Sequence, residues 1–335
     1  MPMTSIGDLS FSHQSIRQTG RLKAQLQDLS VSLATGQKDD LTKALGSNRG
    51  LVMRIDQDLA RLDGFDRAAD DSGLRLKVMQ TTLGSIDDMR QTLADQISLP
   101  SSDLSNSGLA TATKGARQIF DSLVAALNTK VAGRALFAGQ EIDRSALAPP
   151  ETMMADLRTA VAGAGSFNEL SQRIDTWFDD PSGGFAAVGY IGGGGAMIDT
   201  PVSAKRHLDI ELTAADTSLK EVLKMAALAA LAGDASAGLS ADEQKTALTA
   251  ATAGARSAAA GLVNLQGDIG NSQAYLMEAQ AENTAARATF NLTRNSMTQA
   301  DPFETASELQ QVQQNLEIHY AVTARLSRLS LANYL

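Results

Sequence analysis

The chain has 335 residues, of which 4% are aromatic and none is cysteine. Without cysteine there is no disulfide framework, thiolate metal site or thiol nucleophile. The formal net charge of −9 argues against nucleic acid or an anionic membrane as the main partner, because both select basic surfaces.

The first strong pattern is a leucine seam near the N-terminus. Leu22, Leu26, Leu29 and Leu33 recur at intervals of four, three and four residues, which is the spacing of a coiled-coil helix. Apolar residues before this seam are irregularly spaced, so the first twenty residues are predicted to form a weak helix or a flexible arm. Gly36 is expected to end the helix as a left-handed cap.

Two further helices are predicted before the middle of the chain. Apolar residues recur at helical spacing from Val52 to Ile97, which predicts one long helix, interrupted at most near Gly64 or Gly73. A third helix has its apolar face at residues 119–127 and is expected to end at Gly133.

The composition changes at Glu141, where prolines, glycines and short β-like runs replace the long helical patterns. The β-like runs cover residues 186–191, 197–202 and 207–212, and the turn Gly192–Gly195 separates the first two. We interpret residues 141–217 as a small α+β insert.

Helical periodicity returns at Ser218 and is most regular from Leu262 to Met297. Ser272 and Asn283 are polar members of this seam, and such residues fix the register of paired helices at a cost in stability. Helical seams at both ends of the sequence can pair with each other if the chain runs out and back.

The predicted fold is therefore mainly α, a long antiparallel helical or coiled-coil bundle formed by the N- and C-terminal segments. Residues 36–140 and 218–300 form the bundle, with the insert at its far end. Residues 1–35 and 301–335 form terminal helices that order on assembly.

The last predicted helix starts at Asp301 as cap and Pro302 as first residue. On a helical wheel its apolar residues fall into two stripes about 135° apart. The first stripe contains Leu309, Val312, Leu316, Tyr320 and Leu331, and the second contains Ile318, Val322, Leu326 and Leu329.

A helix that covers one core needs one apolar stripe, so the second stripe requires another surface. Burial of its four residues could contribute on the order of 6–12 kcal/mol, an upper bound. Association costs roughly 4–15 kcal/mol, so the segment is expected to order when several neighbouring surfaces close on it together. The alternative is that one chain buries both stripes.

No residue pattern indicates catalysis, a cofactor or a metal. His13, His207 and His319 lack metal-ligand spacing and are interpreted as surface or packing residues. Gly192–Gly195 is not followed by the residues of a phosphate-binding loop. The long Leu/Ala seams indicate coiled-coil assembly, and an enzyme in the insert has no supporting residues.

Three segments together resemble the bacterial flagellin superfamily. Leu29–Lys38 is similar to the end of its N-terminal helix, and Ser330–Leu335, after Asp301–Leu309, is similar to its C-terminal ending. Gly133–Gly139 resembles the turn of the hook–filament junction proteins within that superfamily. Ala34 departs from the superfamily's usual serine, and the acidic turn expected soon afterwards is absent.

The resemblance implies a secreted structural protein of the flagellum that forms the hook–filament junction and has no enzymatic activity. Its implied partners are other copies in a ring, an adjacent hook-associated protein, flagellin and an export chaperone. The expected assembly interface is Leu22, Leu26, Leu29, Leu33, Leu316, Ile318, Val322, Leu326, Leu329, Leu331 and Leu335. The residues of the superfamily-like turn are Gly133, Arg134, Leu136, Phe137 and Gly139.

Two alternatives remain from the sequence. A filament flagellin of the same superfamily would be present in far more copies, and a cytoplasmic coiled-coil adaptor would stay inside the cell. Residues 1–9 lack the pattern of an ordinary secretory signal, and no run of about 20 apolar residues could cross a bilayer. These features alone would indicate a cytoplasmic protein, and the export that the resemblance implies would use a route without a cleaved signal.

Overall fold

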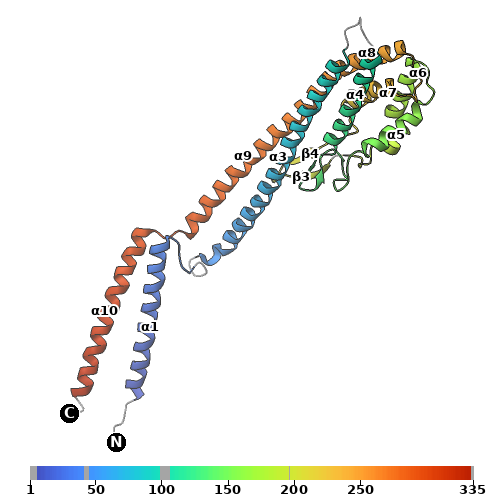
Figure 1. Cartoon of the computed structure of the whole chain (residues 1–335). Coiled ribbons are helices and arrows are strands. Elements are labelled where there is room, and N and C mark those ends of the chain that lie inside the picture. Colours follow the sequence, from blue (N-terminus) through green and yellow to red (C-terminus); the bar gives the residue numbers. More distant parts are fainter. Residues whose placement is uncertain (1–5, 41–44, 99–105, 196, 333–335) are drawn as a thin grey trace. The chain divides into compact units, whose positions relative to one another are not determined.

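The structure is a computed structural model that describes residues 6–40, 45–98, 106–195 and 197–332 (Figure 1). The prediction of a mainly α fold is confirmed, because long helices alternate with only two short antiparallel strand pairs in this part of the chain. The elements are α1 (Ile6–Thr35), η1 (Gly46–Asn48), α3 (Arg49–Ile97), α4 (Asn106–Leu127), β1 (Lys130–Val131), β2 (Arg134–Ala135), α5 (Pro150–Val161), α6 (Phe167–Asp179), η2 (Phe185–Gly189), β3 (Met197–Pro201), β4 (His207–Ile210), α7 (Thr217–Ala232), α8 (Ala241–Ser257), α9 (Ala259–Thr298) and α10 (Pro302–Ala332).

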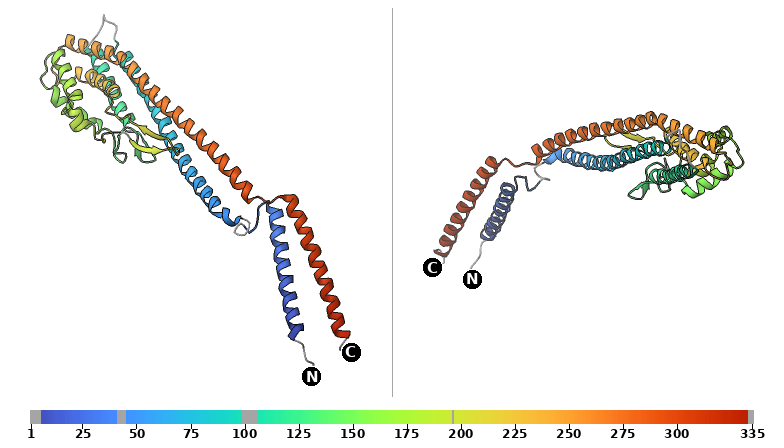
Figure 2. Two further views of the ribbon diagram at one scale, coloured as in Figure 1. Left: turned by 180° about the vertical axis from the view of Figure 1, so that it is seen from behind. Right: turned by 45° about the horizontal axis from the view of Figure 1, so that its top comes forward.

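The chain divides into two compact units, each built from both halves of the sequence. One unit comprises Met1–Asp63 with Thr284–Leu335, and the other comprises Gly64–Asn283. The helices α3 and α9 contribute residues to both units. In the first unit α1 and α10 lie side by side and antiparallel in both views of Figure 2.

The core of the second unit is formed where α4 and α8 pack on α7. The helix α7 is rich in alanine and leucine, and most of its residues are buried, so neighbouring helices cover it on more than one side. Among the largest fully buried side chains of the described residues are Phe120, Phe137, Phe178, Leu76, Met79, Leu83, Ile86, Leu93 and Leu123.

The long helix α3 is continuous through both glycines at which an interruption was expected. A Cβ atom at Gly73 would lie 3.3 Å from Leu276 Cδ2, so this glycine allows close packing of α3 against α9. Helix α1 begins at Ile6, so residues 6–20 form the helix that was one of the two expected alternatives for this segment.

Two sequence predictions of local structure are wrong. Helix α4 ends at Leu127 rather than Gly133, because residues 130–135 form a hairpin whose turn uses left-handed backbone at Ala132 (φ 50°) and Gly133 (φ 80°). The run 186–191, expected to be a strand, lies largely in the π-helix η2. The ring of Phe185, the first residue of η2, stacks on that of Phe178 with centroids 5.6 Å apart, and this tertiary contact holds the start of the segment.

The other two β-like runs are confirmed as β3 and β4, which pair antiparallel with an irregularity between Met197 and Thr200. None of the helices in the described part of the chain has both the length and the apolar character needed to span a bilayer.

Candidate assembly interface

The first apolar stripe of α10 packs against the leucine seam of α1. Thr19 Oγ1 lies 3.5 Å from His319 Nδ1, so these two residues lie level on the antiparallel helices. Stepping three or four residues along each helix from that pair, in opposite directions, predicts which other residues face each other. These are Leu22 with Leu316, Leu26 with Val312, and Leu29 with Leu309. Val312 is 5% exposed and Leu22 is 8% exposed, so the chain itself covers this part of the seam, whereas Tyr320 of the same stripe is 46% exposed.

The second apolar stripe of α10 is exposed in the single chain. Ile318 is 61% exposed, Val322 is 47% exposed and Leu326 is 41% exposed. The side chains of Leu329 and Leu331, and all of Leu335, lie outside the described residues. Leu33, expected at the interface on α1, is 39% exposed at the end of its seam.

The segments that follow α1 and precede α10 are joined by backbone hydrogen bonds. The amide of Lys38 donates to the carbonyl of Thr298 (2.9 Å), and the amide of Ala300 donates to the carbonyl of Gly36 (3.0 Å). Gly36 has φ 69°, which confirms the expected left-handed cap. Asp301 Oδ1 accepts hydrogen bonds from the amides of Phe303 (2.8 Å) and Glu304 (3.1 Å), so the predicted N-cap is also confirmed.

The superfamily-like turn lies in the second unit and packs into its core. Leu136 and Phe137 are buried, whereas Gly133 and Arg134 are exposed at the hairpin. Gly139 has φ 61°, and a Cβ atom there would lie 2.4 Å from the carbonyl oxygen of Gly193. The turn is therefore a packing element, and of its residues only the hairpin tip faces solvent.

The partner of this turn is Gly192–Gly195, a relation that the sequence pattern did not reveal. The amide of Gly193 donates to the carbonyl of Ala138 (2.8 Å), and the hydroxyl of Tyr190 donates to the carbonyl of Gly193 (2.8 Å). Glycine is needed on both sides because two backbones approach closely. The sequence signals this contact only through its glycines, Gly139 and the run Gly192–Gly195, which lie well apart in the chain.

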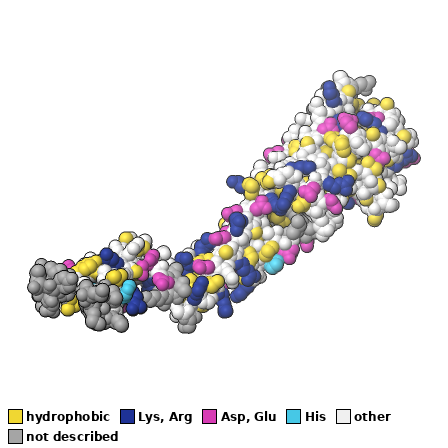
Figure 3. Space-filling model, turned by 90° about the horizontal axis from the view of Figure 1, so that it is seen from below, with side chains coloured by type: hydrophobic (Ala, Val, Ile, Leu, Met, Phe, Trp, Pro, Cys, Tyr) yellow, Lys and Arg dark blue, Asp and Glu magenta, His cyan; other side chains and the backbone are white. Residues whose placement is uncertain are grey.

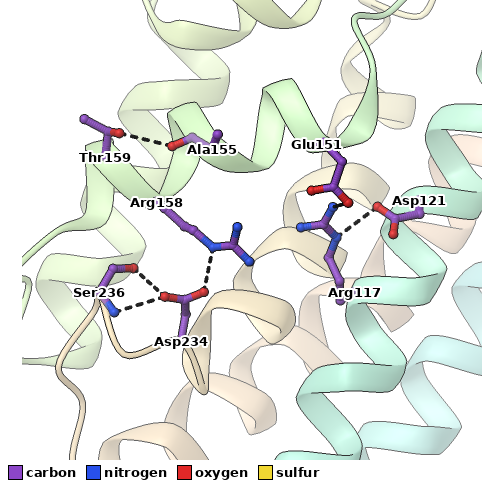
Figure 4. Close-up of polar contacts among 8 residues, drawn as sticks. All are labelled: Arg117, Asp121, Glu151, Ala155, Arg158, Thr159, Asp234 and Ser236. Atoms are coloured by element: carbon purple, nitrogen blue, oxygen red, sulfur yellow. Dashed lines mark hydrogen bonds and ion pairs between the residues drawn. The ribbon is translucent and has the colours of Figure 1, made fainter.

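Charged side chains in the second unit pair with one another. Figure 4 shows Arg117 on α4 bonded to Glu151 on α5 (2.9 Å), and Arg158 on α5 bonded to Asp234 (2.8 Å). Burial raises the pKa of Asp234, but hydrogen bonds from Ser236 and from the Arg158 guanidinium outweigh it and hold this pKa below the ordinary value. These charges link α4, α5 and the segment after α7.

The described residues contain no group of three or more metal-ligating side chains that could hold an ion. His13 is exposed, His207 Nδ1 lies 2.9 Å from Asp199 Oδ1, and His319 lies in the seam between α1 and α10. On the face drawn in Figure 3, basic and acidic side chains are interspersed with apolar ones. The described helices therefore leave apolar side chains such as Ile318 and Val322 exposed.

The fold defines a class of mainly α proteins in which N- and C-terminal segments pair as long antiparallel helices and an α+β segment is inserted between them. No protein-family model and no curated protein sequence matches this chain. Among solved structures, the fold is similar to that of a candidate flagellar hook-associated protein from Vibrio parahaemolyticus. The TM-score is 0.51 at 12% identity, and the match covers 73% of this chain and 95% of that one. At this identity the likeness concerns the fold.

Proposed function

We propose that this chain is a structural, non-catalytic component of the bacterial flagellum, a hook-associated protein that forms the hook–filament junction. The observation that carries the proposal is the exposed stripe of Ile318, Val322 and Leu326 on a helix whose other apolar stripe already packs on α1. A subunit of a polymer needs such a surface, because its neighbours bury it on assembly.

Two further findings support a flagellar role. The first is the likeness of the fold to the Vibrio parahaemolyticus protein described as flagellar hook-associated. The second is the resemblance of Leu29–Lys38, Ser330–Leu335 and Gly133–Gly139 to motifs of the flagellin superfamily. The turn Gly133–Gly139 favours the junction protein over filament flagellin.

In this proposal the chain forms a ring with other copies, between another hook-associated protein and flagellin. It leaves the cell through the flagellar export channel without a cleaved signal, accompanied by an export chaperone. A chain without cysteine has no disulfide to form before passage, so it can travel unfolded. The terminal segments 1–35 and 301–335 then become fully ordered when neighbours close on them.

The test is a double substitution on the exposed stripe, Val322→Asp with Leu326→Asp. Burial of two carboxylates in an apolar contact is strongly unfavourable, so the variant should fail to join the flagellum. Both positions are exposed in the single chain, so the melting temperature of the purified protein should hardly change. The measurements are thermal unfolding and the amount of the chain in isolated flagella.

The matched control is Ala321→Asp with Ala324→Asp, which adds the same charge at exposed positions of α10 outside both stripes. This control should assemble normally. Normal assembly of the stripe variant would refute the proposal, and a large fall in its melting temperature would show that the stripe is internal core. Thousands of copies of the wild-type chain per flagellum would identify a filament subunit instead of a junction protein.

A further inference from the structure

Helix α9 also carries a second apolar stripe, within the part that belongs to the second unit. Placed at about 100° per residue, its members fall within an arc of about 80°. They are Val263, Gly267, Gly270, Ala274, Met277 and Ala281. The buried residues Leu262, Ile269 and Leu276, which face the core, lie roughly 120° away.

This stripe is open to solvent in the single chain. Val263 is 61% exposed and Met277 is 63% exposed. A Cβ atom added at Gly267 or Gly270 would meet no atom within 4 Å, so nothing within the chain explains the choice of glycine there. Glycine costs about 1 kcal/mol relative to alanine inside a helix, so two of them in one exposed helix face are unfavourable for the single chain.

Helix α3, which pairs with α9, has a charged exposed surface. The exposed residues of α3 in the same unit include Arg67, Asp71, Lys77, Asp88 and Asp95. By contrast, no charged residue of α9 falls within the arc of its stripe, and on the helical wheel Glu278 lies about 20° and Glu282 about 60° outside that arc. Both pair with Arg206, at 2.9 and 3.0 Å. Of these two paired helices, α9 is therefore the one that carries an uncharged exposed stripe.

We propose that the α9 stripe is an interface with a second copy of this chain. The inference rests on the proposed function, in which like copies lie next to one another. Charge supports this occupant, because copies of net charge −9 repel each other elsewhere and approach most easily through an uncharged face. A partner recognised by its own charge would require opposite charges on the stripe. The small residues allow the backbone of an opposing helix to come close.

The interface is too small to hold two free copies together. A stable interface buries about 800 Å² on each partner, whereas this stripe covers five turns of one helix face. The purified chain is therefore expected to associate weakly, and the contact becomes stable where several interfaces close at once.

The first experiment uses the absence of native cysteine. Ala274→Cys on the stripe and Asn264→Cys, exposed about 100° away from Val263, are each labelled with a benzophenone maleimide and irradiated at rising protein concentration. Cross-linked dimers should form in several-fold higher yield from position 274 than from position 264. Equal yields from both positions would overturn the inference, and this arm does not require the flagellum.

The second experiment replaces the wild-type chain in the cell. Ala274→Arg should abolish incorporation into isolated flagella at an unchanged melting temperature, and Asn264→Arg should incorporate normally. Normal incorporation of Ala274→Arg would overturn the interface while leaving the proposed function intact.

Irradiated flagella carrying the label at position 274 should yield an adduct of two copies of this chain. An adduct only with a different protein would also overturn the inference. Absence of the wild-type chain from flagella would refute the proposed function, and the purified-protein comparison would then decide the interface alone.

Discussion

Lys224 on α7 shows how one residue can join two helices. Its ammonium lies 2.8 Å from Asp179 and 3.2 Å from Asp175, both on α6, and 2.9 Å from Glu221 on its own helix. The residue is 9% exposed. Burial lowers the pKa of Lys224, but the hydrogen bonds with these three carboxylates outweigh it and raise the pKa above its ordinary value of 10.5.

We predict that Lys224→Met lowers the free energy of unfolding by about 1–3 kcal/mol at neutral pH, because three carboxylates lose their common partner. Since the folded state raises the pKa of Lys224, its stabilisation is fully present below pH 10.5 and is lost as the pH rises above that value. Denaturant unfolding from pH 7 to pH 11 should therefore show a smaller alkaline loss in the variant than in the wild type.

The control for this prediction is Lys245→Met, at an exposed lysine on α8 that lies 3.4 Å from Asp242. It should change the free energy of unfolding by less than about 0.5 kcal/mol. An equal effect of the two substitutions would contradict the structural role assigned to Lys224.

At the scale of elements, α3 and α9 are held in register by polar pairs that repeat every seven residues. Arg294 pairs with Asp56 (2.7 Å) and Arg287 with Asp63 (2.8 Å). Seven residues further along each helix, the Gln280 amide donates to Asp70 (3.1 Å). The heptad spacing of these pairs matches that of the apolar seam, as in antiparallel coiled coils.

We predict that Gln280→Arg increases the free energy of unfolding by about 0.2–1 kcal/mol, because a charged donor replaces the uncharged amide that now donates to the Asp70 carboxylate. The gain should disappear at high salt, since the pair is exposed. The control is Gln273→Arg, seven residues before Gln280. Continuing the seven-residue repeat of pairs places residue 273 opposite Lys77, so the new arginine would face a like charge. It should be neutral or destabilising. A similar gain in both variants would rule out the pairing as the cause.

The long helices could be predicted from the sequence because their apolar spacing extends over many turns, and local interruptions such as Gly73 do not outweigh it. The polar seam residue Asn283 was also recognised as a candidate for fixing register. Its partners were not predictable, because its amide donates to Asp66 (3.2 Å) and to the carbonyl of Val202 (2.9 Å), which belongs to the segment between β3 and β4. Short elements depend on such distant contacts, so η2 and the β1–β2 hairpin were missed.

At the scale of the whole molecule, the terminal helices differ from the second unit in how much they bury. Helices α1 and α10 share one seam, and their outer residues are exposed, whereas α7 is covered on several sides. This contrast is in keeping with our proposal that residues 1–35 and 301–335 order fully on assembly. The second apolar stripe of α10 could be predicted from helical spacing, but a single sequence does not reveal which surface covers it.

We predict that limited proteolysis of the purified chain cuts first within residues 1–35 and 301–335. A two-helix seam opens locally at low cost, so its backbone is available to a protease before that of the larger core. Mass spectrometry of the early products should show a stable central fragment. First cleavage within residues 141–217, with intact terminal helices, would contradict both the prediction and the proposed domain organisation.

The paired backbone hydrogen bonds between residues 36–38 and 298–300 have a mechanical consequence. These bonds connect the segment after the C-terminal end of α1 to the segment before the N-terminal end of α10. Tension applied to one terminal helix is therefore transmitted to the other. A pull on a single helix must shear these bonds and the shared seam together. The two chain ends would then resist force as a pair.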